Sequence, residues 1–90
     1  MNSSDPKRPR ATRAWFGSGL LHVKLEDGRV LSAAYKRFTR LARATPAQRN
    51  HCELVGKGVG IHWPDIDEDL SVDGLLRDAV RVRPAKKKAG

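Results

Sequence analysis

The first part of the chain alternates between apolar and polar positions. Residues 20–25 follow this period of two, which is typical of a strand with one buried face. A turn signal follows, and a three-residue loop over 26–28 puts Leu31 and Ala33 on the same buried face while giving the loop glycine a left-handed position. Residues 13–16 precede a Gly-Ser-Gly turn and predict a third strand, so we expect an antiparallel meander.

Beyond Tyr35 the period becomes that of a helix. Phe38, Leu41 and Ala42 lie at positions i, i+3 and i+4, which predicts a short amphipathic helix with these residues on its apolar face. The run TPAQ at residues 45–48 has a hydroxyl at the N-cap, proline at the first helical position and glutamine at the third. A second helical turn is therefore expected to begin there.

The second half predicts another hairpin and another helix. Residues 52–55 and 59–63 are short β-like runs joined by Gly-Lys-Gly, and we expect them to extend the first sheet. Pro64 ends the second run, and Ser71 can cap a helix whose apolar residues fall within 72–76. The predicted fold class is α+β, with a small antiparallel sheet of hairpins packed by two or three short helices.

Composition places this module between two basic arms. Ninety residues suffice for one domain, and the 39% hydrophobic content allows a small core. Residues 1–10 and 81–90 offer little to bury and are predicted to be disordered, which leaves the folded module at 11–80. A polar, basic start without an apolar stretch predicts a cytoplasmic protein, and no apolar run is long enough for a membrane span.

The net charge of +8 is unevenly distributed along the chain. Residues 15–57 hold eight basic and three acidic side chains, whereas residues 58–78 hold one basic and six acidic ones. The acidic stretch does not match a calcium loop, because Leu70 and Leu76 stand where glycine and a bidentate glutamate are needed. It is instead a solvated loop before a helix N-terminus, or a docking surface for a basic partner.

The chain offers little for metal binding or catalysis. The three histidines and the one cysteine lack the spacing that preorganises zinc, so no metal or cofactor is expected. His22 alternates outward on its strand and is expected to be exposed to solvent. Cys52 and the adjacent His51 would point to opposite faces of a strand, which leaves the thiol without a base. Cys52 is more simply a small buried residue, and the sequence predicts a protein that is not an enzyme and has no catalytic residues.

Several runs within residues 20–78 carry a family resemblance. They are EDGR at 26–29, FTRL at 38–41, ATPAQR at 44–49 and, most specific, GIHWPDIDEDLSVDGLL at 60–76. With these runs the chain resembles the small bacterial domain-of-unknown-function family numbered 2442. The resemblance implies a compact α+β module of bacterial or phage origin, from a family discussed as antitoxin-like and with no established enzyme activity. The basic arms lie outside this pattern.

The first functional hypothesis is a protein–protein binding module, antitoxin-like or a regulatory accessory protein. Its acidic loop and following helix would contact a basic, toxin-like protein partner. Trp63 shares a strand face with Ile61, which favours the core, and an exposed contact is the alternative. The candidate partner-binding residues are Trp63, Asp65, Asp67, Glu68, Asp69 and Asp73.

The alternative is a nucleic-acid-binding accessory protein that uses the arms and the basic helix. Such side chains would attract nucleic acid nonspecifically through its phosphates, with an affinity that falls as salt rises. The candidate contacts are Lys7, Arg8, Arg10, Lys36, Arg37, Arg40, Arg43, Lys86, Lys87 and Lys88. The oligomeric state is left open by the sequence.

Overall fold

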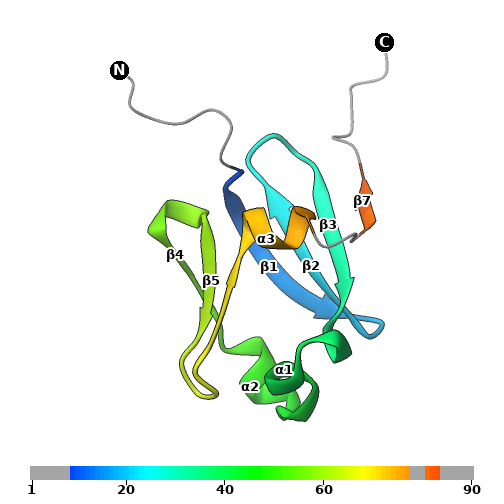
Figure 1. Ribbon diagram of the computed structural model, residues 1–90, viewed down its shortest axis with the longest axis vertical. Helices are drawn as coiled ribbons and strands as arrows, with labels where there is room; N and C mark the ends of the chain where they lie inside the picture. Colours follow the sequence, from blue (N-terminus) through cyan, green and yellow to red (C-terminus); the bar gives the residue numbers. More distant parts are fainter. Residues whose placement is uncertain (1–8, 78–80, 84–90) are drawn as a thin grey trace.

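The computed structural model describes residues 9–77 and 81–83 (Figure 1), and they form two antiparallel sheets. The four-stranded sheet has the order β1-β2-β3-β7, and the three-stranded sheet has the order β4-β5-β6. The strands are β1 (Ala11–Gly17), β2 (Leu20–Leu25), β3 (Val30–Ala34), β4 (Glu53–Val55), β5 (Gly60–Trp63), β6 (Glu68–Ser71) and β7 (Arg81–Arg83).

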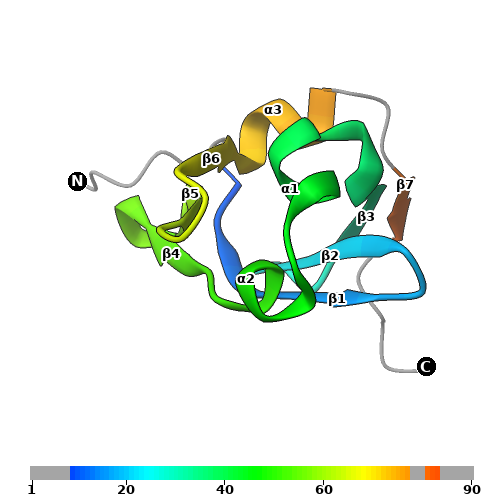
Figure 2. The same cartoon turned by 90° about the horizontal axis from the view of Figure 1, so that it is seen from below.

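Short helices connect the strands and cover one side of the larger sheet. They are η1 (Tyr35–Arg37), α1 (Thr39–Arg43), α2 (Pro46–Asn50), η2 (Gly56–Gly58) and α3 (Val72–Arg77). Figure 2 shows α1 and α3 on the same side of the four-stranded sheet, with the smaller sheet beyond its β1 edge. The α+β class is confirmed. No helix in the described part of the chain is long and apolar enough to cross a membrane.

The β2–β3 hairpin has the predicted three-residue loop. The amide of Leu25 donates to the carbonyl of Arg29 at 2.8 Å, and the amide of Gly28 donates back to Leu25 at 2.9 Å. Gly28 has a φ of +94°, the left-handed conformation that glycine adopts without a Cβ penalty. Leu31 and Ala33 are buried as expected, because this loop length sets the register that turns them inward.

Helix α2 begins with the predicted capping box. The amide of Gln48 donates to Thr45 Oγ1 at 3.1 Å, and the amide of Thr45 donates to Gln48 Oε1 at 2.9 Å. Ser71 also acts as predicted, because its hydroxyl accepts from the amide of Gly74 at 2.9 Å. Helix α1 differs from its prediction in one respect. Leu41 is buried but Ala42 is exposed, since five residues bring little more than one side chain to the core.

Trp63 lies in the core with 0% of its surface exposed. Its indole N–H donates to the carbonyl of Arg49 at 2.9 Å, which satisfies the polar atom that burial would otherwise leave unpaired. Phe16 meets its ring edge-on at a centroid distance of 6.3 Å. The other fully buried large side chains are Leu21, Val23, Leu25, Leu31, Leu41, Ile61 and Val72, from both sheets and two helices.

Three expectations about the sheet need correction. The second hairpin does not extend the first sheet, because it pairs with β6 and forms a sheet of its own. Residues 68–71 are therefore a strand and not a loop before the helix. Residues 81–83 pair with β3, so the folded module reaches beyond the predicted boundary at residue 80. Residues 1–8 and 84–90 of the predicted arms, with Lys7, Arg8 and residues 86–88, lie outside the described residues.

Candidate functional site: an acidic sheet face

The candidate site lies on the outer side of the three-stranded sheet. Successive residues of a strand point to opposite sides, so Ile61 and Trp63 enter the core while His62 faces outward. The register places Glu53 of β4 and Asp69 of β6 opposite His62. His62 Nδ1 lies 2.8 Å from Asp69 Oδ1, and the Asp69 side chain is 70% exposed. The result is an acid–imidazole–acid row that crosses three strands.

The β5–β6 turn adds carboxylates at the end of this row. Asp65 lies there, with a carboxylate oxygen 2.8 Å from Nδ1 of His51. Asp67 has a φ of +54°, a conformation that aspartate tolerates better than most residues. Its carbonyl accepts a hydrogen bond from Arg40 Nη1 at 2.6 Å, which ties the turn to α1. We use the name acidic face for Glu53, Asp65, Asp67 and Asp69. Glu68 stands opposite the inward-pointing Trp63, so it lies on the other side of the sheet.

The carboxylates of the acidic face alter the titration of the imidazole between them. The hydrogen bond that His62 donates to the Asp69 carboxylate raises the pKa of His62. Desolvation has a smaller, opposing effect, and the nearby charges of Glu53 and Asp67 raise the pKa further. A raised pKa means that the row favours a positive charge at its centre. A cation supplied by a partner would meet the same negative potential, so the face is suited to bind lysine or arginine side chains.

Cys52 lies beside this face without the properties of a nucleophile. It packs against the core, and its burial, followed by the charge of Glu53, raises the pKa of the thiol. A raised pKa keeps the thiol protonated at neutral pH, and the thiolate is the reactive form. Within the described ranges, no group of three or more His, Cys, Asp or Glu side chains is arranged to hold a metal ion.

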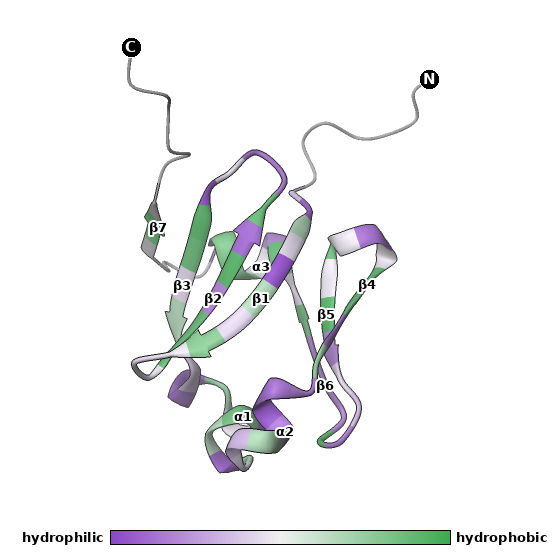
Figure 3. Cartoon of the chain, turned by 180° about the vertical axis from the view of Figure 1, so that it is seen from behind, coloured by the Kyte–Doolittle hydropathy of each residue, from purple (hydrophilic) through white to green (hydrophobic). Residues whose placement is uncertain are grey.

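The predicted partner-binding residues separate into three groups. Asp65, Asp67, Glu68 and Asp69 lie on the β5–β6 hairpin, but Glu68 is on the side of the sheet opposite to Asp69. Asp73 lies at the far end of that hairpin on α3 (Figure 3), where it pairs with Arg77 at 3.5 Å. Trp63 does not reach the surface. Its prediction as a contact residue is corrected because the large apolar ring fills the core.

The contact expected from the α3 segment also needs correction. Val72 and Leu75 are buried at 0% and 3% exposure, so they pack the module and are not available to a partner.

Sequence reasoning missed three members of the site. Glu53 and His62 stand opposite each other because of the β4–β5 register, and His51 reaches the turn from the end of α2. The Gly-Lys-Gly loop taken alone would align residues 53 and 61. In the structure Val59 also belongs to the loop, and this one-residue difference in register places Glu53 opposite His62. His51 had no local signal, because its partner Asp65 is fourteen residues away. The expected exposure of His22 to solvent also needs correction, because this residue is half-buried.

The predicted basic residues lie close to the acidic ones. Lys36 and Arg37 are on η1, Arg40 and Arg43 are on α1, and all four are exposed. Arg40 donates to the acidic turn, so the basic helix and the acidic face are neighbours and not separate surfaces. Arg10 is half-buried and precedes β1.

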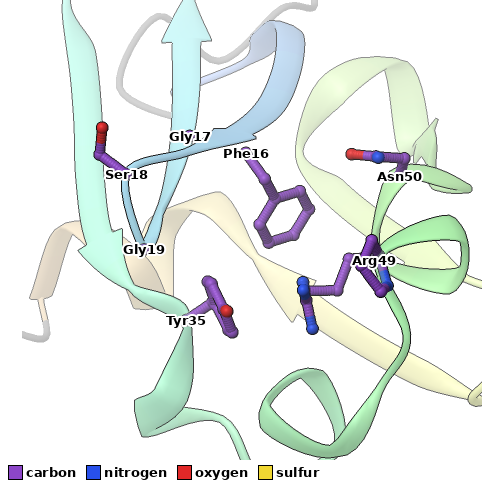
Figure 4. A pocket seen from close by; sticks show the side chains of 8 residues that line it. Phe16, Gly17, Ser18, Gly19, Tyr35, Arg49 and Asn50 are labelled. Atoms are coloured by element: carbon purple, nitrogen blue, oxygen red, sulfur yellow. The ribbon is translucent and has the colours of Figure 1, made fainter.

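A shallow hollow of about 250 Å³ opens between the β1–β2 turn, Tyr35 and α2 (Figure 4). Phe16 points into it from β1, and Arg49 forms its opposite wall. The Arg49 guanidinium lies 4.3 Å from the Tyr35 ring centroid and donates to the carbonyl of Ala44 at 2.6 Å. These contacts of Arg49 hold α1 and α2 together. We therefore interpret the hollow as a gap between packed elements and not as a ligand site.

Comparison with known proteins identifies the family. A crystal structure of a protein of unknown function from Rhodospirillum rubrum ATCC 11170 is similar, with 34% sequence identity and a TM-score of 0.70. The match covers 76% of this chain and 84% of that one. No curated protein matches the chain. Residues 11–81 match the family model described as "Protein of unknown function (DUF2442)". The resemblance noted in the sequence is thus confirmed, and the chain belongs to the DUF2442 family.

Proposed function

We propose that this protein is a non-enzymatic binding module and that its acidic face receives a basic partner protein. The observation that carries the proposal is the exposed row of Glu53, His62 and Asp69 across three strands, continued by the acids of the turn. Like charges gathered on one sheet face lower the stability of the fold. A complementary partner would offset this repulsion, steer the encounter and give specificity.

An apolar side chain beside the acids supports a protein as the partner. Val55 is 37% exposed and lies in the next row of the same outer side, opposite Gly60. Because Gly60 has no side chain, Val55 can lie over it, and a Cβ at Gly60 would be only 3.1 Å from Val55 Cγ2. An apolar centre with charged groups at its rim is the usual composition of protein interfaces. A toxin-like basic protein falls within the class of partner proposed.

Nucleic-acid binding through the basic helix is the weaker candidate. Arg40 already donates to the Asp67 carbonyl, and the carboxylates of the turn lie beside it. Phosphates that approached α1 would therefore meet repulsion from the acidic face as well as attraction from the arginines.

The test is capture of a partner by the tagged full-length protein from a bacterial host, after nuclease treatment. Asp69→Lys reverses the charge in the centre of the acidic face. Glu26→Lys makes the same charge change on the β2–β3 loop and serves as the matched control. We expect one stoichiometric protein with wild type and with the control, and about tenfold weaker capture with Asp69→Lys.

Circular dichroism would establish that both variants are folded before their capture is compared. A partner held equally well by Asp69→Lys would place the interface elsewhere on the module. Recovery of only nuclease-sensitive material would reject the protein-binding function.

A further inference from the structure

The outer side of the four-stranded sheet is a second surface, on the far side of the molecule from α3. Leu21, Val23 and Leu31 point from this sheet into the core. Side chains alternate along a strand, so His22 and Lys24 of β2 point outward, together with the residues paired with them in β1 and β3. Figure 1 shows α3 in front of the sheet, and Figure 3 shows the opposite side, across which no described helix lies. We call this side the open face.

An aromatic stack lies on the open face. The ring of Trp15 is stacked on the ring of His22, with centroids 5.3 Å apart and planes inclined by 24°. The guanidinium carbon of Arg13 lies 4.7 Å from the centroid of the indole. His22 is fixed in turn by its ring nitrogens, which lie 2.8 Å from Ser32 Oγ and 3.3 Å from the carbonyl of Gly17. Trp15 is therefore a half-exposed ring held in one orientation.

The stack is flanked by positive charge. Arg13 stands directly opposite Lys24, and two like charges in this position destabilise a sheet. None of the residues in β1, β2, β3 and β7 is acidic, so the strands themselves provide no compensating carboxylate. The same row continues along the backbone register through Val30 to Arg83, the last residue of β7.

The two ends of the described chain lie at the same end of the sheet, on its opposite edges. Strand β1 begins, and β7 ends, at the end of the sheet that carries Arg13 and Lys24 (Figure 1). The open face combines an oriented aromatic ring and a basic row.

We propose that the open face binds single-stranded nucleic acid, with a base stacked at Trp15 and the backbone phosphates near Arg13 and Lys24. Proteins that bind single strands combine these two features, because every base offers a face for stacking and every nucleotide a phosphate. Duplex DNA hides its base faces and is read by a helix or ribbon in a groove, which a broad sheet face does not supply. An acidic peptide would satisfy the charges but would leave the aromatic ring unused.

The size of the face sets the length of strand that it can hold. Four strands at a spacing of about 4.8 Å span roughly 14 Å, enough for a few nucleotides. This site lies on a different sheet from the acidic face, so it does not depend on the proposed protein partner.

Intrinsic fluorescence provides the test, because Trp63 is fully buried while Trp15 is half-exposed. The full-length protein is titrated with an oligothymidine of about twelve nucleotides at low salt. We expect saturable quenching, since a base stacked at Trp15 alters its emission and leaves Trp63 unchanged. Polyphosphate of comparable charge should produce little quenching, because it has phosphates and no bases.

Three variants separate stacking from general charge attraction, with binding followed by anisotropy of a labelled oligothymidine. Trp15→Leu keeps an apolar side chain but should remove the quenching and weaken binding about tenfold. Lys24→Glu reverses a charge on the open face and should also weaken binding about tenfold. Lys36→Glu makes the same charge change on η1 and should have a much smaller effect. Circular dichroism establishes that each variant is folded.

Several results would overturn the proposal. One is the absence of saturable binding at low salt. Another is equal affinity for polyphosphate or for duplex DNA of the same length, which would assign binding to charge alone. Equal losses with Lys24→Glu and Lys36→Glu would mean that no particular face is used. Saturable binding of a polyglutamate peptide that is tighter than that of oligothymidine would assign the open face to an acidic protein.

Discussion

A glycine allows the β4–β5 turn to approach β1 closely. Gly58, in the β4–β5 turn, is buried against the first residue of β1 and has a φ of +96°. A Cβ at this position would overlap the carbonyl oxygen of Ala11 and lie 3.0 Å from its nitrogen. Backbone atoms cannot rotate away as a flexible side chain can, so Gly58→Ala must push the edges of the two sheets apart.

Two contributions give the expected magnitude. A side chain in the left-handed region costs about 1–2 kcal/mol, and overpacking against fixed atoms costs about another 1–3 kcal/mol. Gly58→Ala should therefore lower the free energy of unfolding by about 3 kcal/mol. Gly19→Ala is the matched control, because Gly19 also has a positive φ, of +77°, but a Cβ there would meet nothing within 4 Å. It should show only the first contribution.

Gly17→Ala completes the series, since its Cβ would make one ordinary contact of 3.9 Å and its φ lies outside the left-handed region. We expect a change within about 0.5 kcal/mol. Urea unfolding followed by tryptophan fluorescence gives all three free energies. If Gly58→Ala were no more destabilising than Gly19→Ala, the approach between η2 and β1 would not be the constraint that we infer.

Three further predictions concern the site and its supports. Thr45→Ala removes the hydroxyl of the capping box and should lower the free energy of unfolding by about 1 kcal/mol, whereas Thr45→Ser should retain it; urea unfolding checks both. The pKa of His62 is raised in the folded state, so the His62–Asp69 pair stabilises the fold fully below pH 6.5, the imidazole's ordinary pKa, and loses this effect as pH rises through the folded pKa. An NMR titration of the imidazole should show the raised pKa in wild type, and Asp69→Asn should bring it down. Burial raises the pKa of Cys52, so its reaction with a thiol reagent at pH 7 should be much slower in native protein than in urea; equal rates would contradict the burial.

Local signals predicted much of the fold. The loop over residues 26–28 was predictable because only one loop length turns Leu31 and Ala33 inward, and the glycine accommodates the turn. The start of α2 was predictable because a capping box uses residues three apart in the chain. In both cases the residues that determine the geometry are neighbours in sequence.

The arrangement of the second sheet was not predictable in the same way. Residues 68–71 alternate in burial, yet their high content of acids resembles a solvated loop and hides the strand. Whether the β4–β5 hairpin joins the first sheet or forms a new one depends on contacts such as Gly58 against Ala11, which are remote in sequence. The short strand at residues 81–83 is likewise specified by its partner β3 more than by its own composition.

The candidate site was predicted in part, for a related reason. The acids of the β5–β6 turn are contiguous in sequence and were found from charge alone. His62 and Glu53 belong to the site because the strand register places them beside these acids. Trp63 does not belong to it, because its ring fills the core. Charge therefore located the site, and pairing across strands determined its composition.

Arg49 connects the end of α1 and helix α2 to the buried Trp63 of β5. Its guanidinium holds the end of α1, and its carbonyl receives the indole N–H of the buried Trp63. Helix α2 has five residues and buries none of them, so an isolated segment of this kind would fray readily. Here, unwinding the last turn of α2 would leave the indole N–H of Trp63 without a hydrogen-bond partner inside the core. Hydrogen exchange of amides in this small helix should accordingly track global unfolding, so that a helix with no buried residue reports on the opening of the whole domain.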